Sequence, residues 1–205
     1  MKKIKLIALF GPAGAGKDFI LDALESHLQY TNIDCHKVMR CTTRPERTYT
    51  KQDQDEDNKN IEYYHLTDED FKNKEKNNFF VTTTFFVVNN ETTLWWYGTP
   101  WEELKEDTLN IGIFNIGEIR DMLCIPEIEV YPIYIQANDK VRIMRQLTRE
   151  EYPNIHEICR RFLSDEKDYK NIDFNFLRLD NSSDLRYYPQ LINIINVCQN
   201  SSIIQ

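Results

Sequence analysis

Short apolar runs alternate with amphipathic stretches along most of the chain, and this pattern predicts a layered α/β fold. The first run, Ile4–Phe10, is almost entirely apolar, which is typical of a strand buried on both faces of a parallel sheet. Ile20, Leu24 and Leu28 then recur at helical spacing, which predicts a helix over residues 17–29. A buried strand followed directly by an amphipathic helix is the repeating element of α/β proteins.

The same criteria place the remaining elements. Further strands are predicted at residues 35–39, 63–66, 111–115, 130–135 and 174–179. Further helices are predicted near residues 68–75, 118–124, 139–149, 155–169 and 185–198, with a short helix at 101–105. Residues 79–88 and 92–97 are aromatic and β-branched, and Asn89-Asn90-Glu91 between them favours a hairpin. Because residues 40–99 are β-rich while both ends alternate, we expect one domain with an inserted subdomain.

Composition narrows the class of protein. A length of 205 residues is enough for one α/β domain with a substantial core. The formal net charge of −8 argues against nucleic acid as the main partner but is compatible with a small anionic ligand. No apolar run approaches the roughly 20 residues that span a membrane, and the five cysteines lack metal-binding spacing. We therefore expect a cytoplasmic protein with free thiols, without a membrane or nucleic-acid partner.

A phosphate-binding pattern lies between the first strand and the first helix. Residues 11–17, Gly-Pro-Ala-Gly-Ala-Gly-Lys, match G-x-x-x-x-G-K in the context that this pattern requires. Glycines allow backbone N–H groups to turn around phosphate oxygens, the helix N-terminus adds positive potential, and Lys17 is placed to reach the β- and γ-phosphates. The residues predicted to bind a nucleoside triphosphate are Gly11, Ala13, Gly14, Ala15, Gly16, Lys17 and Asp18. The alternative is an ordinary glycine-rich turn, which the flanking strand and helix disfavour.

Asp18 departs from the usual form of this pattern. The residue after the lysine is normally Ser or Thr, whose hydroxyl holds Mg²⁺. A carboxylate is also a hard oxygen ligand, directly or through water, although its charge partly opposes the phosphates. We therefore predict that Asp18 helps to bind the Mg²⁺ that accompanies ATP.

Two later segments indicate a second phosphate site. The first is residues 42–47, Thr-Thr-Arg-Pro-Glu-Arg, followed by Tyr63, and the second is Tyr97-Gly98-Thr99. The guanidinium fork of arginine suits a phosphate monoester, and tyrosine hydroxyls can complete such a site. The alternative is that these arginines only solvate a loop.

Taken in order, the phosphate loop and these segments resemble the guanylate kinase family over residues 4–181. The resemblance implies a P-loop NTPase fold, a three-layer α/β sandwich with a central parallel sheet. It further implies a core at about 1–39, 100–138 and 170–205, a β-rich subdomain for the nucleoside monophosphate at about 40–99, and a helical lid at about 139–169. The implied reaction is phosphoryl transfer from ATP·Mg²⁺ to a nucleoside monophosphate, in a monomer or homodimer.

The resemblance also assigns roles to single residues. Arg44, Arg47, Tyr63, Tyr97 and Thr99 take positions around the acceptor. Lys17 and the lid arginines Arg145, Arg149 and Arg161 take positions that neutralise the transferred phosphoryl group, which is most of what such a reaction requires. The alternative for each lid arginine is a surface ion pair with Glu150, Glu151 or Asp165.

Three positions differ from the family pattern. Arg40 and Thr82 stand where guanylate kinases have a small hydroxyl residue and the glutamate that recognise guanine, and Glu91 is a possible substitute for that glutamate. Asn115 stands at one of two acidic positions on a later strand, and Ile113 replaces the other. These differences remove the clearest reason to expect guanine, and the resemblance as a whole implies GMP, dGMP or a related monophosphate as the acceptor. Two alternatives remain open: a sugar-phosphate kinase like the ribose 1,5-bisphosphate phosphokinases, and a non-catalytic binding module.

Overall fold

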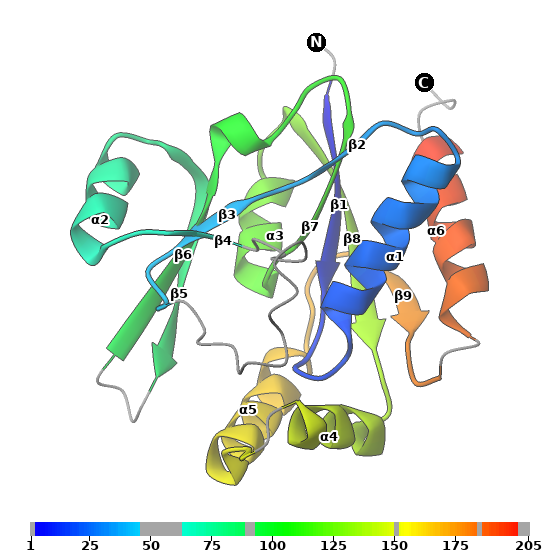
Figure 1. Cartoon of the computed structure of the whole chain (residues 1–205). Helices are drawn as coiled ribbons and strands as arrows, with labels where there is room; N and C mark the ends of the chain where they lie inside the picture. Colours follow the sequence, from blue (N-terminus) through cyan, green and yellow to red (C-terminus); the bar gives the residue numbers. More distant parts are fainter. Residues whose placement is uncertain (1–2, 46–62, 89–92, 150–151, 184–185, 201–205) are drawn as a thin grey trace. The chain divides into compact units, whose positions relative to one another are not determined.

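The computed structural model describes residues 3–45, 63–88, 93–149, 152–183 and 186–200, and Figure 1 shows their elements. The chain forms two compact units. Unit 1 comprises Met1–Lys37 and Glu106–Gln205, and unit 2 comprises Val38–Lys105.

Unit 1 is built on a five-stranded parallel sheet in the order β2-β7-β1-β8-β9. Its strands are β1 (Ile4–Phe10), β2 (Cys35–Lys37), β7 (Leu109–Ile113), β8 (Ile128–Gln136) and β9 (Leu177–Asp180). The first strand, β1, is central, because β7 pairs with one edge and β8 with the other. Leu6 to Phe10 are fully buried, as the apolar run predicted.

Helices cover both faces of this sheet and also lie beyond its carboxyl edge (Figure 1). They are α1 (Lys17–Tyr30), α3 (Ile116–Leu123), α4 (Asp139–Thr148), α5 (Ile155–Asp168) and α6 (Tyr187–Asn200). Apolar residues of α1 and α6 pack with Ile7 and Leu9 in one core cluster. Alternation turns Leu6, Ala8 and Phe10 to the other face, along which α3 packs against β8. The fold is thus the expected three-layer α/β sandwich.

Unit 2 contains a four-stranded mixed sheet in the order β4-β3-β6-β5. Its elements are β3 (Arg40–Thr42), β4 (Tyr63–His65), α2 (Asp68–Lys76), β5 (Phe80–Val88), β6 (Thr93–Pro100) and the 3₁₀ helix η2 (Trp101–Glu103). The predicted antiparallel pairing of β5 with β6 is confirmed, although its turn, residues 89–92, lies outside the described residues. The predicted cap of α2 is also confirmed, since the Thr67 hydroxyl oxygen accepts a 3.1 Å bond from the N–H of Asp70.

Some predicted bounds need correction. The strand predicted at 111–115 ends at Ile113, because Asn115 caps α3. The strand predicted at 174–179 covers only Leu177–Asp180, because Phe174 and Phe176 instead pack around the ring of Phe10. The short helix at 101–105 is a single 3₁₀ turn, and β3 was not predicted at all. All five cysteines lie in described segments and are free, and no described helix is long and apolar enough to cross a membrane.

Candidate functional site

The predicted phosphate loop connects β1 to α1 in a conformation that two glycines make possible. Gly14 and Gly16 have φ of 76° and 85°, in the left-handed region where glycine is favoured. A Cβ atom on Gly14 would collide with the backbone oxygen of Arg142, and one on Gly16 would collide with the side-chain amide of Asn181. Neighbouring elements therefore approach the loop so closely that side chains at these positions are excluded.

The loop leads straight into the N-terminus of α1. The helix begins at Lys17, and its cap residue, Gly16, offers no side-chain acceptor to the first-turn N–H groups. These N–H groups have no partner inside the helix and carry the positive end of the helix dipole. An anion at this position would meet several backbone donors at once, which is the arrangement that binds phosphate.

Side chains from distant elements hold the carbonyl groups of the loop. The Gly11 oxygen accepts bonds from the Lys17 ammonium (2.8 Å) and the Tyr169 hydroxyl (2.9 Å), and the Pro12 oxygen accepts a second bond from Lys17 (3.1 Å). The Ala13 oxygen accepts from Arg142 Nε at 3.2 Å, and the Ala15 oxygen accepts from Arg145 Nη1 at 3.3 Å and Asn181 Nδ2 at 2.9 Å. A trans peptide group directs its C=O and N–H to opposite sides. The N–H of Ala13 donates to Asp165 and that of Ala15 to the Pro12 oxygen, so we expect a ligand to use the N–H groups of Gly14, Gly16 and the first turn of α1.

Lys17 lies against this loop with its ammonium group on two carbonyl oxygens. Burial lowers the pKa of Lys17, and the nearby carboxylates of Asp18 and Asp165 oppose that shift. A cation that is largely withdrawn from water beside a helix N-terminus is stabilised by an anion. The electrostatics therefore agree with the geometry in favouring phosphate.

Asp18 lies in the first turn of α1 with an exposed side chain. Within the described segments, no group of three or more His, Cys, Asp and Glu side chains is placed to hold a metal ion. Mg²⁺ usually keeps several waters and takes only one or two carboxylates beside nucleotide phosphates, so a single carboxylate fits such a site. The metal role of Asp18 stays a prediction.

The three predicted lid arginines have different surroundings. Arg145 donates to Gly14 and Ala15 of the loop, and its Nη2 donates a 3.0 Å bond to the Asn181 oxygen. Arg149 is exposed at the end of α4, yet its charge contributes to lowering the pKa of Lys17. Arg161 pairs with Glu157 one turn earlier on α5, at 2.7 Å. The structure thus brings Arg145 to the loop, whereas Arg149 is exposed at the end of α4 and Arg161 lies in a pair along its own helix.

Glu157 also pairs with Arg160, at 2.7 Å. The hydrogen bonds from Arg160 and Arg161 lower the pKa of Glu157 to about 2. Arg160 and Arg161 thus form the surface ion pairs that were the alternative for helix arginines. Their partner is Glu157 rather than Glu150, Glu151 or Asp165. Glu150 and Glu151 lie outside the described residues.

Four residues that the sequence did not indicate as functional contact the loop: Arg142, Asp165, Tyr169 and Asn181. Arg142 lies one turn before Arg145 on α4, and Tyr169 lies one turn after Asp165, immediately past the end of α5. Burial raises the pKa of Tyr169, which keeps its hydroxyl proton available for the Gly11 oxygen. The helical spacing from Arg145 was the one sequence signal that pointed to Arg142.

In unit 2, the described acceptor residues share one face of the sheet. Cross-strand pairs join Arg40 to Tyr63 and Thr82 to Thr99, and Tyr97 lies two residues before Thr99 on β6. The guanidinium carbon of Arg40 lies 5.9 Å from the ring centroid of Tyr63 and 5.5 Å from that of Tyr97. Alternation along strands therefore gathers these five side chains on the same side.

The opposite face of this sheet is covered by α2. Phe71 of α2 packs with Cys41, Phe80 and Trp96, and a Cβ atom on Gly98 would lie 2.7 Å from the Phe80 ring. Because Gly98 separates Tyr97 from Thr99, those two side chains point away from α2. The predicted acceptor face is thus distinct from the apolar core of unit 2.

Two further features belong to this acceptor face. The guanidinium of Arg44 lies over the Trp95 ring at 4.8 Å, and Arg47 lies outside the described residues. Thr99 is fully buried, and its hydroxyl has no hydrogen-bond partner in the described part of the chain. A buried hydroxyl without a partner is costly, so a ligand group that bonds to it would recover free energy.

Asn115 lies in unit 1, where it caps α3. Its Oδ1 accepts a 2.9 Å bond from the N–H of Glu118, and the Glu118 carboxylate accepts a 3.0 Å bond from the N–H of Asn115. This reciprocal capping box explains an Asn followed three residues later by Glu. The Asn115 Nδ2 is buried without a hydrogen-bond partner among the described residues, so a donor remains for a ligand.

Comparison with known proteins identifies the fold. No family model matches the chain, and no curated protein matches it. Among solved structures, a guanylate kinase from Anaplasma phagocytophilum superposes with a TM-score of 0.58 at 15% identity, covering 100% of this chain and 89% of that one. A gluconokinase from Sinorhizobium meliloti superposes with a TM-score of 0.51 at 9% identity, covering 99% and 98%. The chain therefore has the fold of the P-loop kinases.

Proposed function

We propose that this chain is an ATP-dependent phosphotransferase that moves the γ-phosphoryl group to a nucleoside monophosphate. The observation that carries the proposal is the phosphate loop, whose carbonyls are held by α1, α4, α5 and the residue after β9. Such fixation prepares the N–H groups for phosphate before any ligand arrives, and prepared donors are the main source of catalysis in phosphoryl transfer. The likeness to two solved kinases supports the same reaction class.

In this proposal the donor site belongs to unit 1. The loop N–H groups and the N-terminus of α1 hold the phosphates of ATP, and Lys17 supplies a point charge at the β- and γ-phosphates. Mg²⁺ bound with ATP would neutralise phosphate charge, and in this proposal Asp18, in the first turn of α1, supplies a carboxylate to it. Arg149 is the lid arginine that meets the transferred group in this proposal, and its charge contributes to lowering the pKa of Lys17.

The acceptor site belongs to unit 2. Arg44 and the hydroxyls of Tyr63 and Tyr97 bind the phosphate of the acceptor in this proposal. Arg40 and Thr82 then lie where the base is recognised, and they offer no carboxylate to the N–H donors of guanine. The acceptor is GMP, dGMP or a related ribo- or deoxynucleoside monophosphate, and the base is the part of the substrate that most needs measurement.

An acceptor screen tests the proposal directly. The purified chain is incubated with ATP, Mg²⁺ and each member of a panel of ribo- and deoxynucleoside monophosphates, and the diphosphate product is separated by ion exchange. Turnover that is lost in Lys17→Met supports the proposal. Turnover of ribose 1,5-bisphosphate alone, or nucleotide binding without any turnover, would refute it.

A further inference from the structure

One residue of the phosphate loop, Ala13, has both of its polar backbone groups bound by lid helices. Its N–H donates a 2.8 Å bond to Asp165 Oδ2 of α5, and its oxygen accepts a 3.2 Å bond from Arg142 Nε of α4. Arg142 Nη2 also donates to the same Asp165 oxygen at 3.1 Å. The three bonds form a closed ring that joins α4, α5 and the loop.

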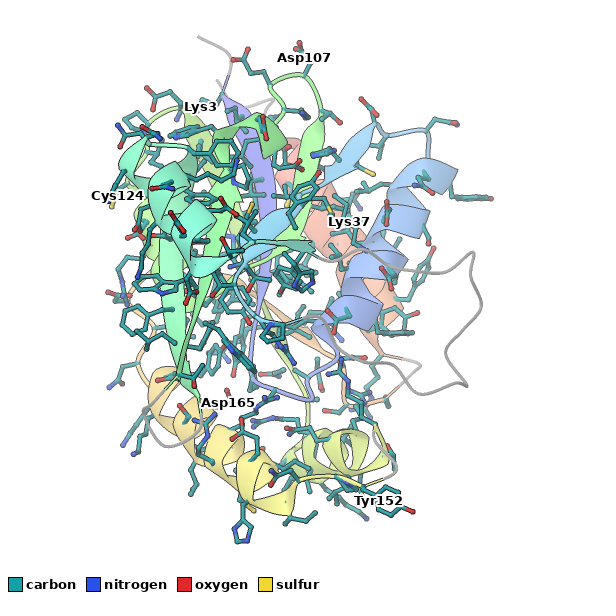
Figure 2. All side chains as sticks on the ribbon, turned by 60° about the vertical axis from the view of Figure 1, so that its left-hand side comes forward. Lys3, Lys37, Asp107, Cys124, Tyr152 and Asp165 are labelled. Atoms are coloured by element: carbon teal, nitrogen blue, oxygen red, sulfur yellow. The ribbon has the colours of Figure 1, made fainter. Side chains whose placement is uncertain are left out.

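This ring is largely withdrawn from solvent, and each of its bonds is part-buried. The Arg142 side chain is 4% exposed and the Asp165 side chain 17%, and Figure 2 shows Asp165 on the part of α5 nearest the sheet of unit 1, far from the exposed Tyr152. Arg142 also bonds Asp139 at 3.1 Å and lies 4.6 Å from the Phe162 ring. Burial raises the pKa of Asp165, and the hydrogen bond from the Ala13 N–H and the charge of Arg142 oppose that shift. Such a pair differs from the exposed ion pairs of α5, which cost little to break.

The ring fixes the part of the loop that precedes Gly14. Ala13 is the second residue of a turn that the Ala15 N–H closes on the Pro12 oxygen at 3.2 Å. The backbone oxygen of Arg142 itself touches Gly14, so α4 supports the loop with its main chain as well as its side chain. Rotation of the Ala13 peptide would turn the following N–H groups away from the ligand.

We propose that Arg142 and Asp165 are positioning residues that hold the phosphate loop in its binding conformation, so that affinity for the donor's phosphates depends on the docking of α4 and α5. This inference rests on the proposed function to the extent that the loop binds a phosphate chain. It assigns the two residues to the loop's outer side, away from the reacting atoms.

The alternative role for Asp165 would have the opposite effect on the affinity for phosphate. A carboxylate bonded to a loop N–H occupies a donor that a phosphate oxygen would otherwise take, and its charge repels the phosphates. In that role Asp165 would oppose nucleotide binding, and its removal would tighten binding. The structure favours positioning, because Asp165 bonds Arg142 and also lies near the charge of Lys17, so two cations oppose its charge, although Arg142 is shared with Asp139 and Glu166.

The test compares Asp165→Ala with Asp168→Ala, the same change one turn along α5 at an exposed residue whose carboxylate accepts a 3.3 Å bond from the Ser164 hydroxyl. Titration calorimetry measures the Kd of ATP and of inorganic tripolyphosphate, which needs no acceptor. We expect Asp165→Ala to weaken both ligands at least about tenfold, and Asp168→Ala to stay within about twofold of the unmodified chain. Asp165→Asn, which keeps an oxygen for the Ala13 N–H but loses the charge, should fall between them.

A second readout separates positioning from general stability. If Asp165 mattered only for folding, its loss would lower the active fraction without changing the KM for ATP. Positioning predicts instead a raised KM for ATP with an unchanged KM for the acceptor. Should Asp165→Ala fail to fold, Arg142→Lys carries the same test, since lysine keeps the charge but cannot bond Ala13, Asp139 and Asp165 together.

The outcomes are distinct. Binding within about twofold of the Asp168→Ala control, or tighter binding, overturns the inference. An unmodified chain that binds tripolyphosphate but phosphorylates no acceptor refutes the proposed function and leaves the inference standing. A chain that binds neither ATP nor tripolyphosphate refutes both.

Discussion

Replacing Gly16 by alanine measures how firmly the phosphate loop is held. Gly16 has φ of 85°, and a conformation in this region costs a non-glycine residue about 1–2 kcal/mol. The new Cβ would also displace the Asn181 amide, which donates a 2.9 Å bond to the Ala15 oxygen from a residue that is 1% exposed. Losing that buried bond costs about 1–3 kcal/mol. We expect Gly16→Ala to lower the free energy of unfolding by about 3 kcal/mol.

The assay is urea unfolding followed by far-ultraviolet circular dichroism, which reports mainly the helices of unit 1. Trp95, Trp96 and Trp101 all belong to unit 2, so their fluorescence is an internal control that should change less. Asn181→Ala removes the obstacle to the new methyl group, so the double variant should lose about 1 kcal/mol less than the sum of the single variants. A cost below about 1 kcal/mol for Gly16→Ala, or strict additivity, would refute this account of the loop.

Four further predictions concern charge and specificity. Lys17→Met should lower kcat/KM at least about a hundredfold with little change in the acceptor's KM, measured by steady-state kinetics. Asp18→Ala should raise the Mg²⁺ concentration needed for half-maximal rate, and an unchanged Mg²⁺ titration would contradict its metal role. Glu157, with its pKa lowered from 4.5 to about 2, stabilises the fold above about pH 4.5 and loses that contribution as the pH falls toward 2. After allowance for solvent screening, Glu157→Gln should lower the free energy of unfolding by about 1 kcal/mol at neutral pH. The urea midpoint of this variant should also change less with pH between 4.5 and 2 than that of the unmodified chain. The double change Arg40→Ser with Thr82→Glu should raise kcat/KM for GMP relative to the other monophosphates, and equal changes for every base would contradict a role of this face in base recognition.

Local sequence signals predicted the parts of the site that local chemistry determines. The phosphate loop follows from glycines at fixed spacing between a buried strand and a helix, and α1 follows from Ile20, Leu24 and Leu28, all fully buried. The cap of α2 follows from Thr67 and the acidic residues after it. Each of these features is decided by residues within one or two turns of chain, so no tertiary information was needed.

The strand β3, which was not predicted from the sequence, shows the limit of local sequence signals. β3 contains Arg40, Cys41 and Thr42, which have no apolar alternation, and its partners β4 and β6 supply the hydrogen bonds that make it a strand. Tertiary pairing therefore overrides weak local preference, as is common for short strands. The same strand places Arg40 on the acceptor face, so the sequence suggested the position of this residue without its structural reason.

The residues that support the phosphate loop could not be predicted from the sequence, for a related reason. Apart from the bonds of Lys17, the bonds that support the loop join residues 129 to 166 positions apart, from Arg142 on Ala13 to Asn181 on Ala15. An arginine or asparagine that contacts a backbone carbonyl leaves no pattern in its own neighbourhood, because any carbonyl is an acceptor whatever residue carries it. The sequence could therefore predict which residues line the loop, but not which residues hold it.

Arg145 illustrates the consequence for mechanism. The resemblance assigned it to the transferred phosphoryl group, yet in the structure both terminal nitrogens of its guanidinium donate to backbone oxygens of Ala15 and Asn181. A guanidinium has five N–H groups, so the N–H groups that these bonds leave over are the ones that could reach phosphate oxygens. Arg145 therefore serves the loop with part of its guanidinium, and its role toward the transferred group stays a prediction. Lys17 is in the same position, because its ammonium group donates to the Gly11 and Pro12 oxygens and keeps a third N–H for a phosphate oxygen.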